Sequence, residues 1–215
     1  MTDRGTTLTE RRRAATQMEI ALAAAELFAG SGAGGKAGAA SADVTAEAVA
    51  RRAGVGLRTF YRYFRTKEDA IAPLLAQGAE RWLRLLAETA RDQPLRDALV
   101  SAAGQALAPA DDEGRASFTW TRGLLRAAHA DPALRAVWLR VNHDTEERLV
   151  PILADLTGRP AGFDTRLAAA AASAAIRVAV ETWALGDEPD SGPGSPADLG
   201  VRAMRELTAN LDALA

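Results

Sequence analysis

The stretch VTAEAVARRAGVGLRTFYRYFRTKEDAI, residues 44–71, decides the fold of this chain. Its pattern predicts two short helices over 46–53 and 57–64, separated by a glycine turn at 54–56. Thr45 stands where the first of these helices needs a side-chain cap. Two short helices joined by a tight turn are typical of a helix-turn-helix, whose second helix enters the major groove of DNA. The stretch therefore predicts a DNA-binding module.

The second short helix carries side chains that suit both bases and phosphates. Arg58 can offer a bidentate fork to guanine, and Thr59 can donate to a phosphate or contact a thymine methyl group. The hydroxyls of Tyr61 and Tyr63 can donate to phosphate oxygens. The alternative is that the aromatic run only closes a small hydrophobic core. The expected DNA-contacting residues are Arg12, Thr45, Leu57, Arg58, Thr59, Tyr61, Tyr63 and Lys67.

Apolar residues recur at helical spacing along nearly the whole chain, and no alternating strand pattern stands out. The glycine-rich connection GSGAGGKAGAAS, which contains Lys36, predicts a loop after the first helix. The expected fold is all-α with about nine helices, divided into a helix-turn-helix DNA-binding domain over 1–68 and a helical ligand-binding and dimerisation domain over 69–215. Besides the two short helices, the pattern predicts helices near 9–30, 66–90, 94–108, 113–129, 132–156, 164–187 and 196–214. Thr66 and Asp69 predict a capping pattern at the first of the long body helices, and Asp131-Pro132 and Ser195-Pro196 predict capped, proline-led helix starts.

Composition and charge restrict the classes of protein that fit this chain. It has 215 residues and no cysteine, which excludes disulfides and thiolate chemistry. Residues 1–68 carry 11 Lys and Arg against 7 Asp and Glu, whereas residues 69–215 carry 15 against 21. A basic head on an acidic body suits a protein whose head meets DNA. No signal sequence and no apolar run of membrane-spanning length stand out, so we expect a cytoplasmic protein without a membrane partner.

The helix-turn-helix region resembles that of the tetracycline-repressor (TetR) family of bacterial regulators. The resemblance covers roughly residues 10–75 and implies three DNA-binding helices, followed by helices that form a ligand pocket and a dimer interface. This chain departs from the family in its longer, glycine-rich first connection, and in Gly56, where the family often has serine. The motifs that carry the resemblance are ELFA (26–29), Thr45, VA (49–50), AGV (53–55), TFYRYF (59–64) and KED (67–69).

Aromatic residues on several predicted helices are candidates for the lining of an apolar pocket, although they suit a plain core equally well. Arg177 interrupts an apolar run, and it either pairs with Glu181 one turn later or binds an anionic ligand. The stretch LLRAAHADPALRAVWLR (124–140), which includes Arg126, resembles a TetR subgroup with acyl-coenzyme-A-like ligands. The expected effector is therefore apolar or acyl-like, with an anionic group as an open option. The candidate pocket residues are Trp82, Phe118, Trp120, Arg122, Trp138, Arg177 and Trp183.

Two of the predicted helices favour a homodimer. The helix over 164–187 has an alanine-rich face, and the helix over 196–214 carries leucines at helical spacing. Two copies of this pair can form a four-helix bundle, whereas the alternative is that these faces complete a monomeric core. The expected interface residues are Ala171, Ala175, Val178, Leu207 and Leu211.

These features together predict a ligand-responsive transcriptional repressor. As a homodimer it would bind a pseudo-palindromic operator in double-stranded DNA, and a small molecule would release it. Two alternatives stay open: a constitutive DNA-binding dimer without a ligand, and an all-helical ligand carrier or enzyme. An enzyme is disfavoured because no catalytic constellation is recognisable. His143 and Glu147 lie one turn apart, but a surface pair suits them better than a metal site, so we expect no metal and no cofactor.

Overall fold

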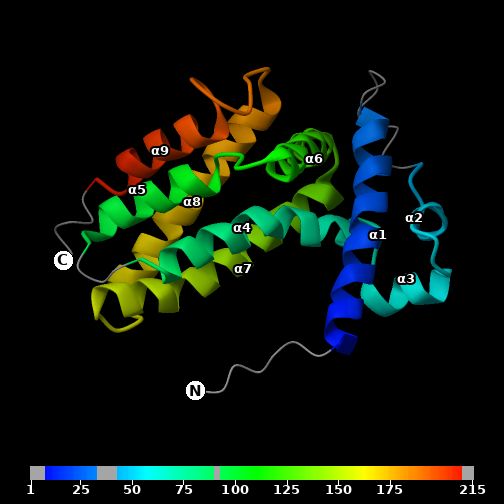
Figure 1. Cartoon of the computed structure of the whole chain (residues 1–215), viewed down its shortest axis with the longest axis horizontal. Coiled ribbons are helices and arrows are strands. Elements are labelled where there is room, and N and C mark those ends of the chain that lie inside the picture. Colours follow the sequence, from blue (N-terminus) through cyan, green and yellow to red (C-terminus); the bar gives the residue numbers. More distant parts are fainter. Residues whose placement is uncertain (1–7, 33–42, 90–92, 210–215) are drawn as a thin grey trace.

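The computed structural model describes residues 8–32, 43–89 and 93–209, and within these ranges the chain is all-α. This confirms the expected fold of about nine helices. Figure 1 shows α1–α3 together at one end of the molecule and α5, α8 and α9 side by side at the other. The elements are α1 (Leu8–Gly32), α2 (Ala46–Arg52), α3 (Leu57–Tyr63), the 3-10 helix η1 (Glu68–Ile71), α4 (Ala72–Ala87), α5 (Leu95–Ala106), α6 (Asp112–Ala130), α7 (Pro132–Thr157), α8 (Phe163–Leu185) and α9 (Pro196–Leu207).

The long helix expected over 66–90 is divided near its start. The segment η1 comes first, and α4 begins only at Ala72 with Pro73 in its first turn. Proline suits this position because the first helical N–H groups have no partner inside the helix. The expected capping pattern is present, since Asp69 N–H donates to Thr66 Oγ1 and Thr66 N–H donates to Asp69 Oδ2.

Both proline-led helix starts have the expected caps. Asp131 accepts from the backbone N–H of Ala133 at 2.8 Å at the start of α7. Ser195 accepts from the N–H of Asp198 at 3.3 Å at the start of α9. The last helix ends at Leu207 rather than near 214, and residues 210–215 lie outside the described part of the chain.

The buried side chains form two apolar clusters. One contains Ile20, Phe28 and Phe60 from the N-terminal helices together with Leu124 and Trp183 from α6 and α8. The other joins α4 and α5 to the C-terminal half of α7, the N-terminal half of α8 and α9. The helices over 1–68 therefore share one core with the body helices, so a shift in the body reaches them through direct packing.

The N-terminal helices approach the body closely where α1 crosses α6. A Cβ added at Gly123 on α6 would lie 2.8 Å from the Cβ of Ala29 on α1. Real Cβ atoms do not approach that closely, so only glycine allows this crossing. The two helices are thereby held in near backbone contact.

Among the described helices, α8 is long and apolar enough to cross a membrane by length and composition. This corrects the expectation that no apolar stretch of that length is present. Half of the stretch is buried inside the protein, where α8 packs against α7 and α9. Its alanine-rich sequence is therefore that of a core helix whose small side chains permit close packing.

Candidate functional site

The turn between α2 and α3 depends on one glycine. Gly54 has φ +68°, in the left-handed region, although an added Cβ there would meet no neighbouring atom. Glycine is therefore needed at position 54 for its left-handed backbone conformation and not for lack of space. The next N–H, of Val55, donates to the carbonyl of Ala50 at 2.9 Å and closes the turn. Thr45 caps α2 by accepting from Ala48 N–H at 3.1 Å.

Helix α3 has one buried face and one exposed face. Phe60 is fully buried in the shared core and lies 5.8 Å from the ring of Phe64. On the other face Leu57, Arg58 and Tyr61 are exposed, and the tyrosine is 53% accessible. The helix is thus anchored by phenylalanines, and three of the residues expected to contact DNA lie on its free surface.

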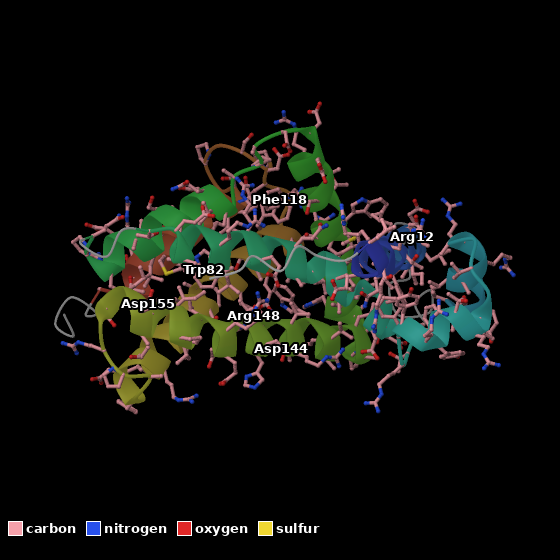
Figure 2. All side chains as sticks on the ribbon, turned by 60° about the horizontal axis from the view of Figure 1, so that its bottom comes forward. Arg12, Trp82, Phe118, Asp144, Arg148 and Asp155 are labelled. Atoms are coloured by element: carbon pink, nitrogen blue, oxygen red, sulfur yellow. The ribbon has the colours of Figure 1, made fainter. Side chains whose placement is uncertain are left out.

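The remaining expected DNA contacts occupy different surroundings. Arg12 is exposed on α1, at the same end of the molecule as α3 (Figure 2). Thr45 is exposed, whereas Thr59 and Tyr63 are half-buried. The Lys67 side chain is only 23% exposed, and its ammonium lies 3.6 Å from Glu68 and over the ring of Phe28.

Two further arginines gather around Tyr63. The guanidinium of Arg13 on α1 lies 5.9 Å from the centre of this ring, and that of Arg62 on α3 lies 5.1 Å from it. Two cations held near one tyrosine ring suit a phosphate group, because an anion between them would relieve their repulsion. Sequence reasoning missed both residues: Arg62 is adjacent to Tyr63 in the chain, but only the tertiary structure brings Arg13 of α1 to the same ring.

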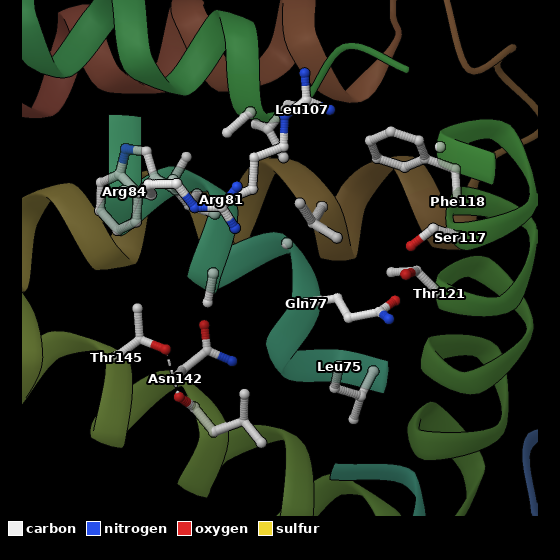
Figure 3. Close-up of a pocket in the computed structure, with 18 of the residues that line it drawn as sticks. Leu75, Gln77, Arg81, Arg84, Leu107, Ser117, Phe118, Thr121, Asn142 and Thr145 are labelled. Atoms are coloured by element: carbon white, nitrogen blue, oxygen red, sulfur yellow. Dashed lines mark hydrogen bonds between the residues drawn. The ribbon is translucent and has the colours of Figure 1, made fainter. Parts of the chain in front are cut away.

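A cavity of about 470 Å³ lies between α4, α6, α7 and α8. Figure 3 shows Gln77, Arg81 and Arg84 entering from α4, with Ser117, Phe118 and Thr121 on the α6 side and Asn142 and Thr145 on α7. Its volume lies within the range of about 300–1,000 Å³ typical of small-molecule sites. The apolar part of the lining includes Leu75, Trp82, Phe118, Trp138, Ile176 and Val180.

Three of the seven candidate pocket residues, Trp82, Phe118 and Trp138, line this cavity. Trp120, Arg122, Arg177 and Trp183 are not part of its lining. Arg177 pairs with Glu181 at 3.1 Å, the first of the two options that the sequence left open. Glu181 also accepts from Trp138 Nε1 at 2.7 Å. This network fixes the Trp138 ring at the cavity wall.

The arginines of α6 hold the connection between α8 and α9. Arg122 stacks 3.9 Å from the centre of the Trp183 ring and donates to the carbonyl of Glu188. Burial lowers the pKa of Arg122, and the nearby Arg126 lowers it further. Arg126 donates to the Ala184 carbonyl at 2.7 Å. Both side chains therefore stabilise the chain after α8, outside the cavity.

A second hollow, of about 410 Å³, lies between α1, the end of α3, η1, α4 and α7. Val141 and Thr145 line both this cleft and the first cavity, so α7 is the wall between them. Two ion pairs cross the cleft, Arg140 with Asp69 and Arg148 with Glu80. The hydrogen bond from Arg148 lowers the pKa of Glu80, and the same bond raises the pKa of Arg148.

The expected interface residues lie on two different faces of the C-terminal helices. Val178 and Leu207 are exposed and Ala171 is half-buried, whereas Ala175 is 0% exposed and packs in the core. Leu211 lies outside the described residues. Large apolar side chains also lie exposed at Leu167 and Leu185 on α8. Together with Ala171 and Val178 they form a stripe at helical spacing, here called the α8 stripe.

Comparison with protein families connects the helix-turn-helix to regulators. Residues 38–71 match the model of the bacterial regulatory proteins of the tetR family. This span contains α2, the glycine turn, α3 and η1. A comparison with curated protein sequences gave no match.

Solved structures share the fold over nearly the whole chain. A candidate TetR-family transcriptional regulator of Mesorhizobium loti has 19% identity and a TM-score of 0.56, over 92% of this chain and 97% of its own. A TetR transcriptional regulator of Rhodococcus sp. RHA1 has 22% identity and a TM-score of 0.53, over 94% and 100%. The regulator FadR of Bacillus subtilis, solved with stearoyl-CoA, has 24% identity and a TM-score of 0.54, over 88% and 96%.

Proposed function

We propose that this chain, a DNA-binding transcriptional regulator with the helix-turn-helix and fold of the TetR family, is a homodimeric repressor that a small molecule releases from its operator. The observation that carries the proposal is the position of α4. This helix lines the 470 Å³ cavity, and only residues 64–71, which include η1, separate it from α3. A molecule that changes the packing of α4 therefore acts on the segment that carries α3.

The operator would be read by the exposed face of α3. Arg58 is the exposed side chain that can form a bidentate contact to guanine, and such a contact contributes about 1–3 kcal/mol of discrimination. Leu57 and Tyr61 flank it, with an apolar surface for a thymine methyl group and a hydroxyl for phosphate. Arg58 is thus the residue whose loss should reduce specificity most.

The dimer would form through the α8 stripe and Leu207. Four exposed or half-buried apolar residues on one helix face are typical of a helix that packs against a second copy. Two-fold symmetry would place the two α3 helices about 34–36 Å apart, one turn of DNA. Val178→Asp should shift the chain to monomers in analytical ultracentrifugation. Leu139→Asp is the matched control, because Leu139 on α7 is also 46% exposed but lies outside the stripe.

The largely apolar cavity favours a ligand-responsive regulator over a constitutive DNA-binding dimer. A cavity that reaches 470 Å³ leaves its apolar lining without packing partners, which is unfavourable unless a molecule fills it. FadR, whose fold is similar, was solved with stearoyl-CoA. An apolar effector in the cavity of this chain would act by favouring one arrangement of the helices over another.

DNA binding is tested with a labelled duplex from immediately upstream of the gene for this chain. Fluorescence anisotropy at ~150 mM salt, with scrambled competitor, should give a Kd below ~10⁻⁷ M for the wild type. Arg58→Ala should weaken binding about tenfold or more. Arg159→Ala, in the exposed connection between α7 and α8, is the control and should bind normally. Equal, weak binding by all three proteins would contradict the assignment of α3 as the reading helix.

A further inference from the structure

Two residues of the cavity lining each have a buried polar side-chain atom without a hydrogen-bond partner among the described residues. These atoms are Nε1 of Trp82 and Oγ of Ser173. Both residues line the cavity, from α4 and α8, and they are 2% and 7% exposed. An indole N–H can only donate, and a serine hydroxyl can donate or accept. Both atoms can donate a hydrogen bond, so the group that this lining lacks is a hydrogen-bond acceptor.

Other polar groups in the same lining are already engaged within the protein. Asn142 Nδ2 donates to the Trp138 carbonyl at 2.8 Å, and Thr145 Oγ1 donates to the Val141 carbonyl at 2.7 Å. The indole N–H of Trp138 is bonded to Glu181. Trp82 and Ser173 differ from these neighbours because a buried donor without an acceptor is rare and unfavourable.

The charges around the cavity disfavour an anionic ligand. The charged lining residues are Arg81 and Arg84 on α4 and Asp111 and Glu113 at the start of α6, so the positive and negative charges balance. All four side chains are exposed or half-buried, whereas the two unpartnered atoms are buried and neutral. A carboxylate placed beside Trp82 would lose its hydration in a lining that offers no net positive charge. A multiply negative group on the part of the ligand outside the cavity would be repelled by Asp111 and Glu113.

We propose that the cavity binds an uncharged carbonyl compound with an apolar body, of the ester or ketone class. Its carbonyl oxygen accepts the hydrogen bond of Trp82 Nε1, and the Ser173 hydroxyl donates to the same polar end of the ligand. The body lies against Leu75, Phe118 and Val180. This inference rests on the proposed role of the cavity as the effector site, and it names the class of the effector.

Four probes of matched chain length test the ligand class: methyl octanoate, octanoate, octanoyl-coenzyme A and nonane. Binding to the full chain without DNA is followed by tryptophan fluorescence and by the shift in Tm. One additional hydrogen bond corresponds to a preference of about 3- to 10-fold, so the ester should bind that much more tightly than nonane. It should also bind more tightly than octanoate and octanoyl-coenzyme A.

Two substitutions locate the preference at the unpartnered atoms. Trp82→Phe and Ser173→Ala should each reduce the ratio of ester to nonane affinity by about 3-fold or more. Trp120→Phe is the control, because Trp120 is not part of the cavity lining, and it should leave the ratio unchanged. Ser173→Ala also covers the case in which Trp82→Phe fails to fold, since alanine is already abundant in α8.

The outcomes separate this inference from the proposed function. Equal affinity for the ester and nonane, tighter binding of either charged probe, or no binding of any probe would overturn the inference. A clear preference for the ester, lost in Trp82→Phe or Ser173→Ala, would support it even if DNA affinity did not respond. In that last case the inferred ligand class would be supported, whereas the proposed role of the cavity as the effector site would be contradicted.

Discussion

Arg140 of α7 forms an ion pair with Asp69 of η1, and the same carboxylate accepts the backbone N–H of Thr66. Arg140 binds through Asp69 Oδ1, and Thr66 binds through Oδ2. The next residue on α7, Val141, lines both the ligand cavity and the cleft beside α3. A single pair of residues thus connects the wall of the cavity to the turn that follows α3.

The Arg140–Asp69 pair should hold the turn after α3 in place. Arg140→Gln should lower the free energy of unfolding by less than about 1 kcal/mol, because the pair is partly exposed. Asp69→Ala should cost about 1–2 kcal/mol, since it also removes the cap on Thr66. Denaturant unfolding measures both values.

Hydrogen exchange then tests the local effect of the same pair. In Arg140→Gln the amides of residues 66–70 should exchange faster, while those of α5 keep their protection. Arg166→Gln is the control, because Arg166 pairs with Glu147 at 3.5 Å, away from this turn. Unchanged exchange at 66–70 in Arg140→Gln would show that α7 does not support the turn.

The second ion pair across the cleft makes stability depend on pH. The hydrogen bond from Arg148 lowers the pKa of Glu80, so the folded chain binds this proton less readily than the unfolded chain does. The stabilisation is therefore complete above the ordinary glutamate pKa of about 4.3, and it is lost as the pH falls through the lower folded-state value. The difference in unfolding free energy between wild type and Glu80→Gln should be constant from pH 5.5 to 7 and shrink below about pH 4.

The two partners of this pair are about half exposed, so the effect should be small, within about 1 kcal/mol. Glu88→Gln is the control at the end of α4, where the carboxyl is exposed. A difference for Glu80→Gln that grows towards acid pH would contradict the lowered pKa of Glu80.

The crossing of α1 and α6 should tolerate no side chain at Gly123. Gly123→Ala places a Cβ 2.8 Å from the Cβ of Ala29, and neither helix can yield without a backbone shift. We expect a loss of about 1–3 kcal/mol from overpacking, which exceeds the gain in helix propensity. Gly78→Ala is the matched comparison within α4, because an added Cβ there meets no atom within 4 Å. It should stabilise the chain by about 0.5–1 kcal/mol, as measured by urea unfolding.

The arginines beside Tyr63 should contact the DNA backbone. If Arg13 and Arg62 each neutralise one phosphate, each Arg→Gln variant should reduce the slope of log K against log salt by about 0.9. Binding should weaken about equally on all DNA sequences, in contrast to Arg58→Ala, which should relax specificity. Arg159→Gln should leave the slope unchanged. A normal slope for both variants would show that neither arginine neutralises a phosphate.

The features predicted correctly from the sequence depend on neighbours along the chain. The all-α class follows from helical periodicity, and the caps at Thr45, Asp131 and Ser195 follow from side chains that reach two or three residues ahead. The Gly54 turn and the buried Phe60 are likewise local, since the turn conformation and the spacing within α3 determine them. Even the Arg177–Glu181 pair is a contact within one helix.

The cavity and its surroundings depend on where separate helices meet. Trp82 and Trp138 line the cavity while Trp120 and Trp183 do not, although all four are equally aromatic in the sequence. The crossings of α4, α6, α7 and α8 decide which of them face the cavity, and no residue spacing along one helix contains that information. The same holds for Ala175, which lies on the core side of an alanine-rich helix.

The sequence by itself therefore determined that this chain is helical and that α2 and α3 form a helix-turn-helix, because those properties arise from interactions within a few residues. Only the tertiary structure decided that Trp82 and Ser173 lie without partners in one cavity, and that Arg140 reaches Asp69. These relationships join residues about 70 or more positions apart along the chain. Their geometry is set by the packing of whole helices, which the pattern of any single helix does not specify.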